Sequence, residues 1–344
     1  MGGSIELPFG LATSVGPLPC DDPVEAARMA LRAQPSFPCS PSLGTTAGSL
    51  LAQAVEDLDA VQVLPPGLLR AGAALVDGDP SHVDELPAVG LGGDSYAAFH
   101  EFVARLSDPP DVGVRVSLLG PVTLALGLRA AGVPTVRAVR IAQHVVARRA
   151  EAMLGAVRSV MPGGVVLVCA SEPGLVGAVH PTFPLTPAEV LSLLTPYVDA
   201  VDGHPDAGEL LIGVHVPGRT DWETVIASGV SVISAPVDRD LAGWSGVLGD
   251  FLDRGGRLVW GAVPVDQPLG TSEELLWRRL SAMWCELVGD GLDPLLLRSR
   301  SLVGPVDGLG HFGVSQAERV LDLVDSLATR VRRQAIGARL TLGA

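Results

Sequence analysis

The chain has 344 residues, a length that one α/β barrel can occupy completely. Hydrophobic residues make up 47% and charged residues 18%, which supplies enough apolar material for a large buried core. The net charge of −14 argues against nonspecific binding to nucleic acid or to an anionic membrane, because both need clustered Lys and Arg.

Short apolar runs rich in β-branched residues recur along the whole chain. Most of them lack a strict two-residue alternation, which indicates strands that are buried on both faces, as in a parallel sheet. The run at 60–65 has the weakest pattern of the set. In chain order the candidate strands are 10–16, 60–65, 112–119, 164–170, 210–216, 230–234, 257–263 and 295–303.

Capping sequences predict where helices begin after these strands. In each, a small oxygen-bearing side chain accepts from first-turn amides, and a carboxylate three residues on completes the box. A strand, a loop and a capped helix, repeated to a count near eight, favour a single (β/α)8 TIM barrel over a doubly wound sheet. The candidate starts are Asp22-Pro23 with Glu25, Thr186-Pro187 with Glu189, Thr220 with Glu223, Thr271 with Glu274, and Ser315 with Glu318.

Residues 66–110 interrupt this rhythm with several turn signals before a helical stretch begins. We interpret them as an insertion between the second and third strands, inside one domain that spans residues 1–344.

In such a barrel the chemistry belongs at the carboxyl ends of the strands. Few residues there can do acid–base or metal chemistry, and the candidates for catalysis are Glu172, His215 and Asp307.

The cysteines and the apolar runs indicate the cellular compartment. None of the four cysteines belongs to a CxxC pair, no signal peptide is recognisable, and no run approaches the roughly 18 uncharged residues of a membrane helix. We therefore expect a cytoplasmic protein with reduced thiols, no nucleic-acid or membrane partner, and a small molecule or another protein as its ligand. Cys20 precedes a candidate helix, whose N-terminus would lower the pKa of its thiol.

Five stretches, in chain order, carry a family resemblance: "ATSVGPLPCDDPVEAAR", "LLGPVTLALGL", "LVCASEPGL", "GVHVPG" and "GPVDGLGHFGVSQAERVL". They are similar to the opening Gly-Ser turn, the Gly-Pro-Val-Thr stretch, the Asp-Glu-Pro turn, the His-x-Cys strand and the Pro-x-Cys-Gly-Leu segment of the cobalamin-independent methionine synthase family. The resemblance is to the C-terminal catalytic barrel of that family, whose fold is shared in outline with uroporphyrinogen decarboxylase. It covers roughly residues 10–335 and implies the same barrel.

The resemblance also implies a zinc site, with His and Cys from one strand, Glu from the next and Cys near the eighth. The zinc converts the thiol of homocysteine into a thiolate, which takes a methyl group from a folate. Here the His matches His215, the first Cys falls on Pro217 and the last Cys on Asp307. The Glu falls near Pro236, with Asp238 two residues further on.

The substrate contacts of that family are altered as well. The Gly-Ser turn becomes Gly16-Pro17 after Ser14, and the Asp that would pair with the substrate amino group becomes Ser171. Ser14, Gly16 and Ser171 are therefore the candidate substrate-binding positions. A catalytic zinc needs three protein ligands and an open position, and His215 is the one matching ligand. We expect no metal cofactor and take His215 to be a hydrogen-bonded pocket histidine, with zinc as the alternative.

Other residues at these strand ends have two interpretations each. Glu172 would either bind a cationic ligand or accept hydrogen bonds from loop amides, and Asp307 either serves chemistry or forms an Asp-Gly turn.

The resemblance and the altered residues leave three candidate functions. The first is a diverged, zinc-free relative that binds a small molecule or a partner protein. The second is an active methyltransferase with an altered His and carboxylate site. The third, a decarboxylase, needs basic residues that the first strand lacks.

Overall fold

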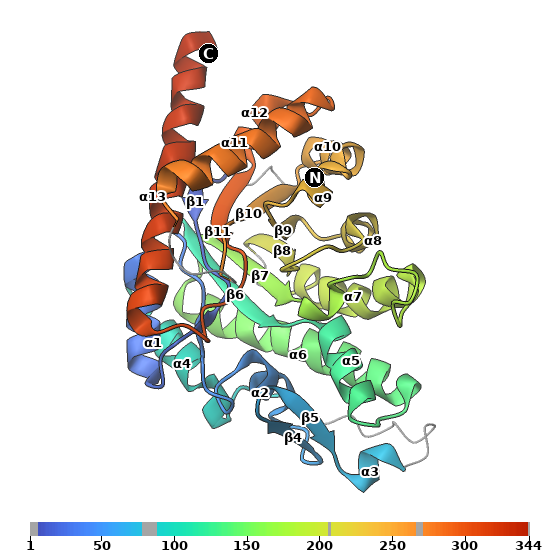
Figure 1. Ribbon diagram of the computed structural model, residues 1–344. Coiled ribbons are helices and arrows are strands. Elements are labelled where there is room, and N and C mark those ends of the chain that lie inside the picture. The colour runs from blue at the N-terminus through green and yellow to red at the C-terminus, as the bar shows by residue number, and fades with distance from the viewer. Residues whose placement is uncertain (1–5, 78–87, 206–207, 266–270, 343–344) are drawn as a thin grey trace.

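The protein is built around one curled parallel sheet that helices cover on its outer side (Figure 1). The computed structural model describes residues 6–77, 88–205, 208–265 and 271–342. The seven strands of the sheet run in the order β1-β11-β10-β9-β8-β7-β6, and every neighbouring pair is parallel. Their bounds are β1 Leu11–Ala12, β6 Gly113–Leu119, β7 Val165–Ser171, β8 Glu209–His215, β9 Val232–Pro236, β10 Arg257–Val263 and β11 Ser301–Pro305.

Helices follow the strands along the chain and pack against the sheet. Figure 1 shows the last helix, α13, crossing the sheet edge and continuing past the other elements. The helices are α1 Pro23–Ala33, α2 Leu50–Val55, α3 Ala73–Val76, η1 Asp94–Tyr96, α4 Ala97–Arg105, α5 Pro121–Ala130, α6 Thr135–Val160, η2 Pro173–Leu175, α7 Pro187–Asp202, α8 Trp222–Ala227, α9 Arg239–Ala242, α10 Ser245–Asp253, α11 Glu273–Gly289, α12 Pro294–Ser299 and α13 Val314–Leu342.

Both faces of the sheet are buried, as the unalternating strand sequences predict. On β7, Val166 and Val168 belong to the large apolar cluster shared with the helices. Their neighbours Val165, Leu167 and Cys169 belong to a smaller cluster made mainly by the strands themselves. Because successive side chains on a strand point to opposite faces, this smaller cluster lies on the concave side of the sheet.

The segment 36–43 makes hydrogen bonds toward both edges of the sheet. On one side the amide of Ser40 donates to the carbonyl of Arg115 on β6 over 2.7 Å, and Cys39 forms an isolated parallel bridge with Arg115. On the other side the amide of Ser42 donates to the carbonyl of Gly16 over 3.1 Å. The short strands β2, Pro17–Leu18, and β3, Ser42–Leu43, then pair in parallel.

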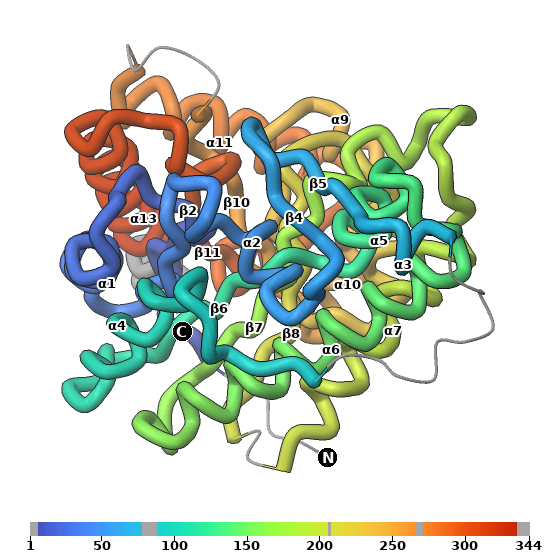
Figure 2. Tube along the Cα trace, turned by 90° about the horizontal axis from the view of Figure 1, so that it is seen from below, coloured from blue at the N-terminus to red at the C-terminus, as the bar shows by residue number. Residues whose placement is uncertain are grey.

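The prediction that residues 60–65 form a strand of this sheet is wrong. Val61–Leu64 is strand β4, which pairs antiparallel with β5, Leu68–Ala71, in a separate hairpin. The reason is the turn at Pro65, Pro66 and Gly67, which reverses the chain; Gly67 has a φ of 110°, a region that glycine adopts without strain. The hairpin lies beside α5 in both views (Figures 1 and 2).

Several predicted boundaries shift for local reasons. Residues 295–303 contain helix α12 before β11, because Asp293 caps that helix and Pro294 occupies its first position. The predicted capping box at Thr186 and Glu189 is present in full. Asp22 caps α1 as predicted. The caps expected at Thr220 and Thr271 belong instead to the next residues, Asp221 and Ser272, and α13 already begins at Val314.

The insertion predicted at 66–110 contains β5, α3, η1 and α4, and residues 78–87 lie outside the described residues. Among helices in the described parts of the chain, none combines the length and apolar character that crossing a bilayer requires.

Candidate functional site

Three polar side chains form a row across neighbouring strands at the carboxyl end of the sheet. Ser171 on β7 is in register with His215 on β8, which is in register with Ser234 on β9. Ser171 and Ser234 share the strand phase of Cys169 and Val232, which belong to the concave cluster. The concave face therefore changes from apolar to polar toward the strand ends where a barrel enzyme places its chemistry.

His215 is almost completely buried and is held from one side. Its Nδ1 lies 2.9 Å from the hydroxyl oxygen of Ser234, a hydrogen bond that fixes the plane of the imidazole. Its Nε2 has no hydrogen-bond partner among the described residues. Burial lowers the pKa of His215, with the positive charge of Arg115 acting in the same direction and Asp307 opposing. A neutral imidazole with one unpaired nitrogen therefore stands at the end of β8.

Asp307 lies on the open side of His215. Its carboxylate oxygen Oδ1 is 3.7 Å from Nε2 of His215, which is too long for a hydrogen bond and makes an ion pair only when His215 is protonated. The same oxygen accepts from the amide of Gly308 over 2.7 Å, so Asp307 also shapes the Asp-Gly turn. Although burial raises the pKa of Asp307, the His215 contact and the Gly308 amide outweigh it and lower the pKa below its usual value. About half of the Asp307 side chain is exposed, at 48%.

Glu172 is fully buried and caps a neighbouring helix. Oε1 accepts from the amide of Val122 over 2.9 Å, and Oε2 accepts from the amide and the hydroxyl of Thr123 over 2.7 and 2.6 Å. Burial raises the pKa of Glu172 to about 7, against the opposing effect of these hydrogen bonds. Both oxygens are thus occupied by the first turn of α5, which corresponds to the second of the two interpretations given to this residue.

The need for Glu172 follows from the helix that it caps. The N-cap residue of α5 is Gly120, which has no side chain to accept from the first-turn amides. A Cβ at Gly120 would lie 2.2 Å from the carboxyl carbon of Glu172, so the glycine also makes room for the carboxylate. The cap of α5 is supplied from the end of β7 instead of from its own N-cap residue.

Arg115 is a buried cation in the same interior, and it was not among the residues predicted from the sequence. It lies on β6 at the same strand phase as Ser117, and its Nη2 donates to the sulfur of Cys169 over 3.2 Å. Its Nε and Nη1 have no hydrogen-bond partner among the described residues. The available signal was one Arg inside an apolar strand, two residues before a serine that faces the same way.

The candidate substrate-binding residues lie around this interior. Ser14 is buried just after β1. Gly16 has a φ of 116°, and a Cβ there would lie 3.1 Å from the Cβ of Ser117, so it permits close packing of the residue before β2 against β6. Ser171 is buried, and its carbonyl accepts from the amide of Gly120 over 2.8 Å. The three residues are brought to one end of the sheet, and their role in binding stays a prediction.

The pKa of the Cys20 thiol is shifted in the direction opposite to the predicted one. Burial raises the pKa of the Cys20 thiol, and the negative charges of Glu25 and Asp21 act in the same direction. Burial is the largest of these causes, and the acidic residues around the start of α1 add to it.

The side chains around His215 do not fit a zinc ion. Within the described residues, no group of three or more His, Cys, Asp or Glu side chains is arranged to hold a metal ion. Pro217 has no donor atom, Glu172 is bound to α5, and Asp238 caps α9 by accepting from the amide of Asp240. In the part of the chain that the structure describes, this leaves His215 and Asp307, fewer than the three protein ligands of a catalytic zinc site.

The fold and the row of strand-end side chains define a parallel α/β protein with a polar centre at the carboxyl edge of its sheet. Two solved structures share this fold across nearly the entire chain. A B12-independent methionine synthase from Shewanella sp. W3-18-1 in complex with selenomethionine superposes with a TM-score of 0.60 and 12% identity, over 96% of this chain and 99% of that one. A putative vitamin-B12 independent methionine synthase from Listeria monocytogenes gives 0.54 and 12%, over 96% and 98%.

At this identity the likeness concerns the fold alone. No protein family model matches the sequence, and no curated protein is similar to it in sequence. The chain therefore resembles these B12-independent methionine synthase-like structures in its fold.

Proposed function

We propose that the chain is a (β/α)8 barrel of the methionine synthase type that binds a small molecule at the His215 end without zinc-dependent methyl transfer. In this proposal the segment 36–43 is the second barrel strand, which closes the ring between residues 16–18 and β6. The hydrogen bonds from Ser40 to Arg115 and from Ser42 to Gly16 support the closure.

One observation carries the functional part of the proposal. Within the described ranges, the single histidine of the strand-end row, His215, faces the half-exposed carboxylate of Asp307 and belongs to no group of three possible metal ligands. The positions that resemble the thiolate ligands of the methionine synthase family are Pro217 and Asp307. Thiolates contribute much of the affinity of structural zinc sites, and a set of one imidazole and one carboxylate leaves zinc with too few ligands.

The metal content of protein purified without chelators tests the proposal. We expect well under one zinc per chain in the wild type and in His215→Ala. The double substitution Pro217→Cys and Asp307→Cys is the positive control, since it restores both thiols and should gain zinc. About one zinc per wild-type chain, lost in His215→Ala, would refute the proposal. A double variant that gains no zinc would refute the assignment of Pro217 and Asp307 to the thiolate positions.

A second candidate function is an active methyltransferase with an altered site. The lowered pKa of His215 favours it, because a neutral imidazole with an unpaired Nε2 can accept the proton of a substrate thiol. Asp307, 3.7 Å away, would then stabilise the imidazolium. Complementation of a methionine auxotroph distinguishes the two functions. Growth that depends on His215 supports methyl transfer, and absence of growth with soluble protein supports the first proposal.

A further inference from the structure

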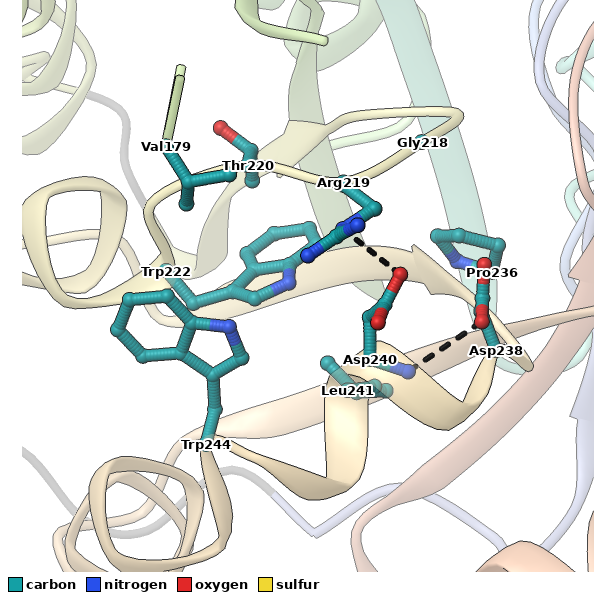
Figure 3. A pocket seen from close by; sticks show the side chains of 10 residues that line it. All are labelled: Val179, Gly218, Arg219, Thr220, Trp222, Pro236, Asp238, Asp240, Leu241 and Trp244. Atoms are coloured by element: carbon teal, nitrogen blue, oxygen red, sulfur yellow. Dashed lines mark hydrogen bonds and ion pairs between the residues drawn. The ribbon is translucent and has the colours of Figure 1, made fainter. Parts of the chain in front are cut away.

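A separate cavity lies next to the strand-end row, between the loop after β8 and the start of α9 (Figure 3). Its volume is about 120 Å³, far more than the space that one water occupies. In the loop that forms one wall, the lining starts at Gly218, three residues after His215, and Pro236 in the opposite wall is two residues after Ser234. The proposed function does not use any of the side chains that line it.

Two indole rings form much of the wall. Trp222 from α8 is buried, and Trp244, which precedes α10, is partly exposed. Figure 3 shows both rings on one side of the cavity, with Leu241 below. Indole faces carry negative electrostatic potential and attract cations more strongly than other aromatic rings do. The partly exposed indole of Trp244 therefore offers a surface for a positively charged group, and the buried Trp222 backs the wall beside it.

The charged lining is net negative. Arg219 and Asp240 form an ion pair, with Nε and Oδ2 2.7 Å apart, so their charges cancel. Asp238 also lines the cavity, and within the described residues no ion pair joins it to a cation. One charge of +1 and two of −1 leave the cavity with −1, supplied by Asp238.

The wall next to Arg219 is held in place by the backbone. The amide of Gly177 donates to the carbonyl of Arg219 over 2.7 Å, which ties the loop after β7 to the loop after β8. A Cβ at Gly218 would lie 2.9 Å from a methyl carbon of Val176, so the two loops are in close contact. A preformed cavity needs little ordering when a ligand enters, and this favours binding.

We propose that this cavity binds a small organic cation of the alkylammonium class, held against the partly exposed indole of Trp244, with the Asp238 carboxylate supplying the net negative charge of the lining. The indoles favour a cation whose charge is spread over apolar surface, and the carboxylate favours a positive over a neutral ligand. An inorganic cation would gain little from this lining, since indole carbons are poor ligands for a hydrated metal. The site is independent of the function proposed for His215.

Isothermal titration with tetramethylammonium chloride tests the proposal, with tert-butyl alcohol as an uncharged probe of similar size. We expect a dissociation constant of about 10 mM for the cation, as a few cation–π contacts provide, and at least tenfold weaker binding of the alcohol. Trp244→Ala should weaken cation binding about tenfold and Asp238→Asn about fivefold. Asn caps a helix as well as Asp does, so Asp238→Asn removes the charge and keeps the start of α9.

Trp277→Phe, in α11 and outside the cavity lining, is the matched control and should leave the affinity unchanged. Circular dichroism shows which variants are folded. If Trp244→Ala does not fold, Asp238→Asn still tests the proposal. Equal affinity for the alcohol, no saturable binding of the cation, full competition by sodium chloride at equal concentration, or unchanged affinity in folded Asp238→Asn would each overturn the proposal. None of these results depends on zinc content or methionine synthesis.

Discussion

Two carboxylates that look alike in the sequence occupy very different surroundings. Glu172 follows β7 and Asp307 follows β11, each at the carboxyl end of an apolar strand. Glu172 is fully buried and bonded through both oxygens to α5, whereas Asp307 is half exposed and faces His215. The difference arises from the next element: α5 begins at a glycine and needs an acceptor from outside, while Asp307 bonds to its own turn. Position at a strand end therefore does not make a carboxylate available for chemistry.

The strongest test of this comparison removes the cap. Glu172→Ala should lower the free energy of unfolding by about 4 kcal/mol, because it leaves the buried amides of Val122 and Thr123 without an acceptor. Chemical denaturation at pH 6 measures the loss. The control is Glu189→Ala, which removes an exposed capping box at α7 and should cost about 1 kcal/mol. Equal losses in the two variants would mean that Glu172 is no more important to the fold than a surface cap.

The shifted pKa values of Glu172 and His215 predict opposite dependences of stability on pH. The pKa of Glu172 is raised to about 7 from an ordinary 4.5, so the folded state keeps a proton that the unfolded state has lost. Its contribution to stability is present below pH 4.5 and is lost as the pH rises to about 7, a change of about 3 kcal/mol. His215, whose pKa is lowered, contributes stability above its ordinary value of 6.5 that is lost as the pH falls below it.

Unfolding curves between pH 4.5 and 7.5 for the wild type and Glu172→Gln separate the two effects. The amide cannot titrate, so the variant should lack the fall in stability toward neutral pH and keep the part due to His215. The interpretation of Glu172 as a carboxyl with a raised pKa fails if the two curves run parallel over this range.

The sequence predicted the parallel sheet and its strand-end residues because burial on both faces leaves a local signature. β6 to β10 fall within two residues of their expected positions, and the capping box of α7 is complete. His215 and Glu172 were found because each ends or follows such a strand. Their strand phase and their order along the chain are local properties, which a single sequence records.

What the sequence did not predict depends on contacts between distant segments. The segment 36–43 was not recognised, since Pro38 and Pro41 interrupt its strand pattern and its hydrogen bonds go to residues near 16 and 115. The role of Glu172 depends on the missing side chain of Gly120, some fifty positions earlier in the chain. Arg115 was not recognised because it is a single charged residue inside an apolar strand, although its charge lowers the pKa of His215.

That charge gives a third test. Arg115→Met should raise the pKa of His215, because the guanidinium is one of the two influences that lower it. The free energy of unfolding should rise by about 1–2 kcal/mol, since Met removes a buried cation that has unpaired donors and no partner carboxylate in the described residues. Nuclear magnetic resonance titration of the imidazole measures the shift. Arg115→Lys keeps the charge and is the control; a lower pKa of His215 in Arg115→Met would show that Arg115 acts through packing instead.

The smallest effect on stability is expected at Asp307, the second of the two carboxylates compared above. Asp307→Asn should lower the pKa of His215 further, because the carboxylate is the group that opposes the effect of burial. Its free energy of unfolding should change by less than about 1 kcal/mol, since half-exposed ion pairs contribute little and Asn can still accept from Gly308. The same titration and denaturation experiments apply. If Asp307→Asn lowers the pKa of His215 with little loss of stability, the Asp307 carboxylate is available to a ligand. A loss as large as that in Glu172→Ala would make Asp307 a second structural cap and leave His215 without a carboxylate partner free for chemistry.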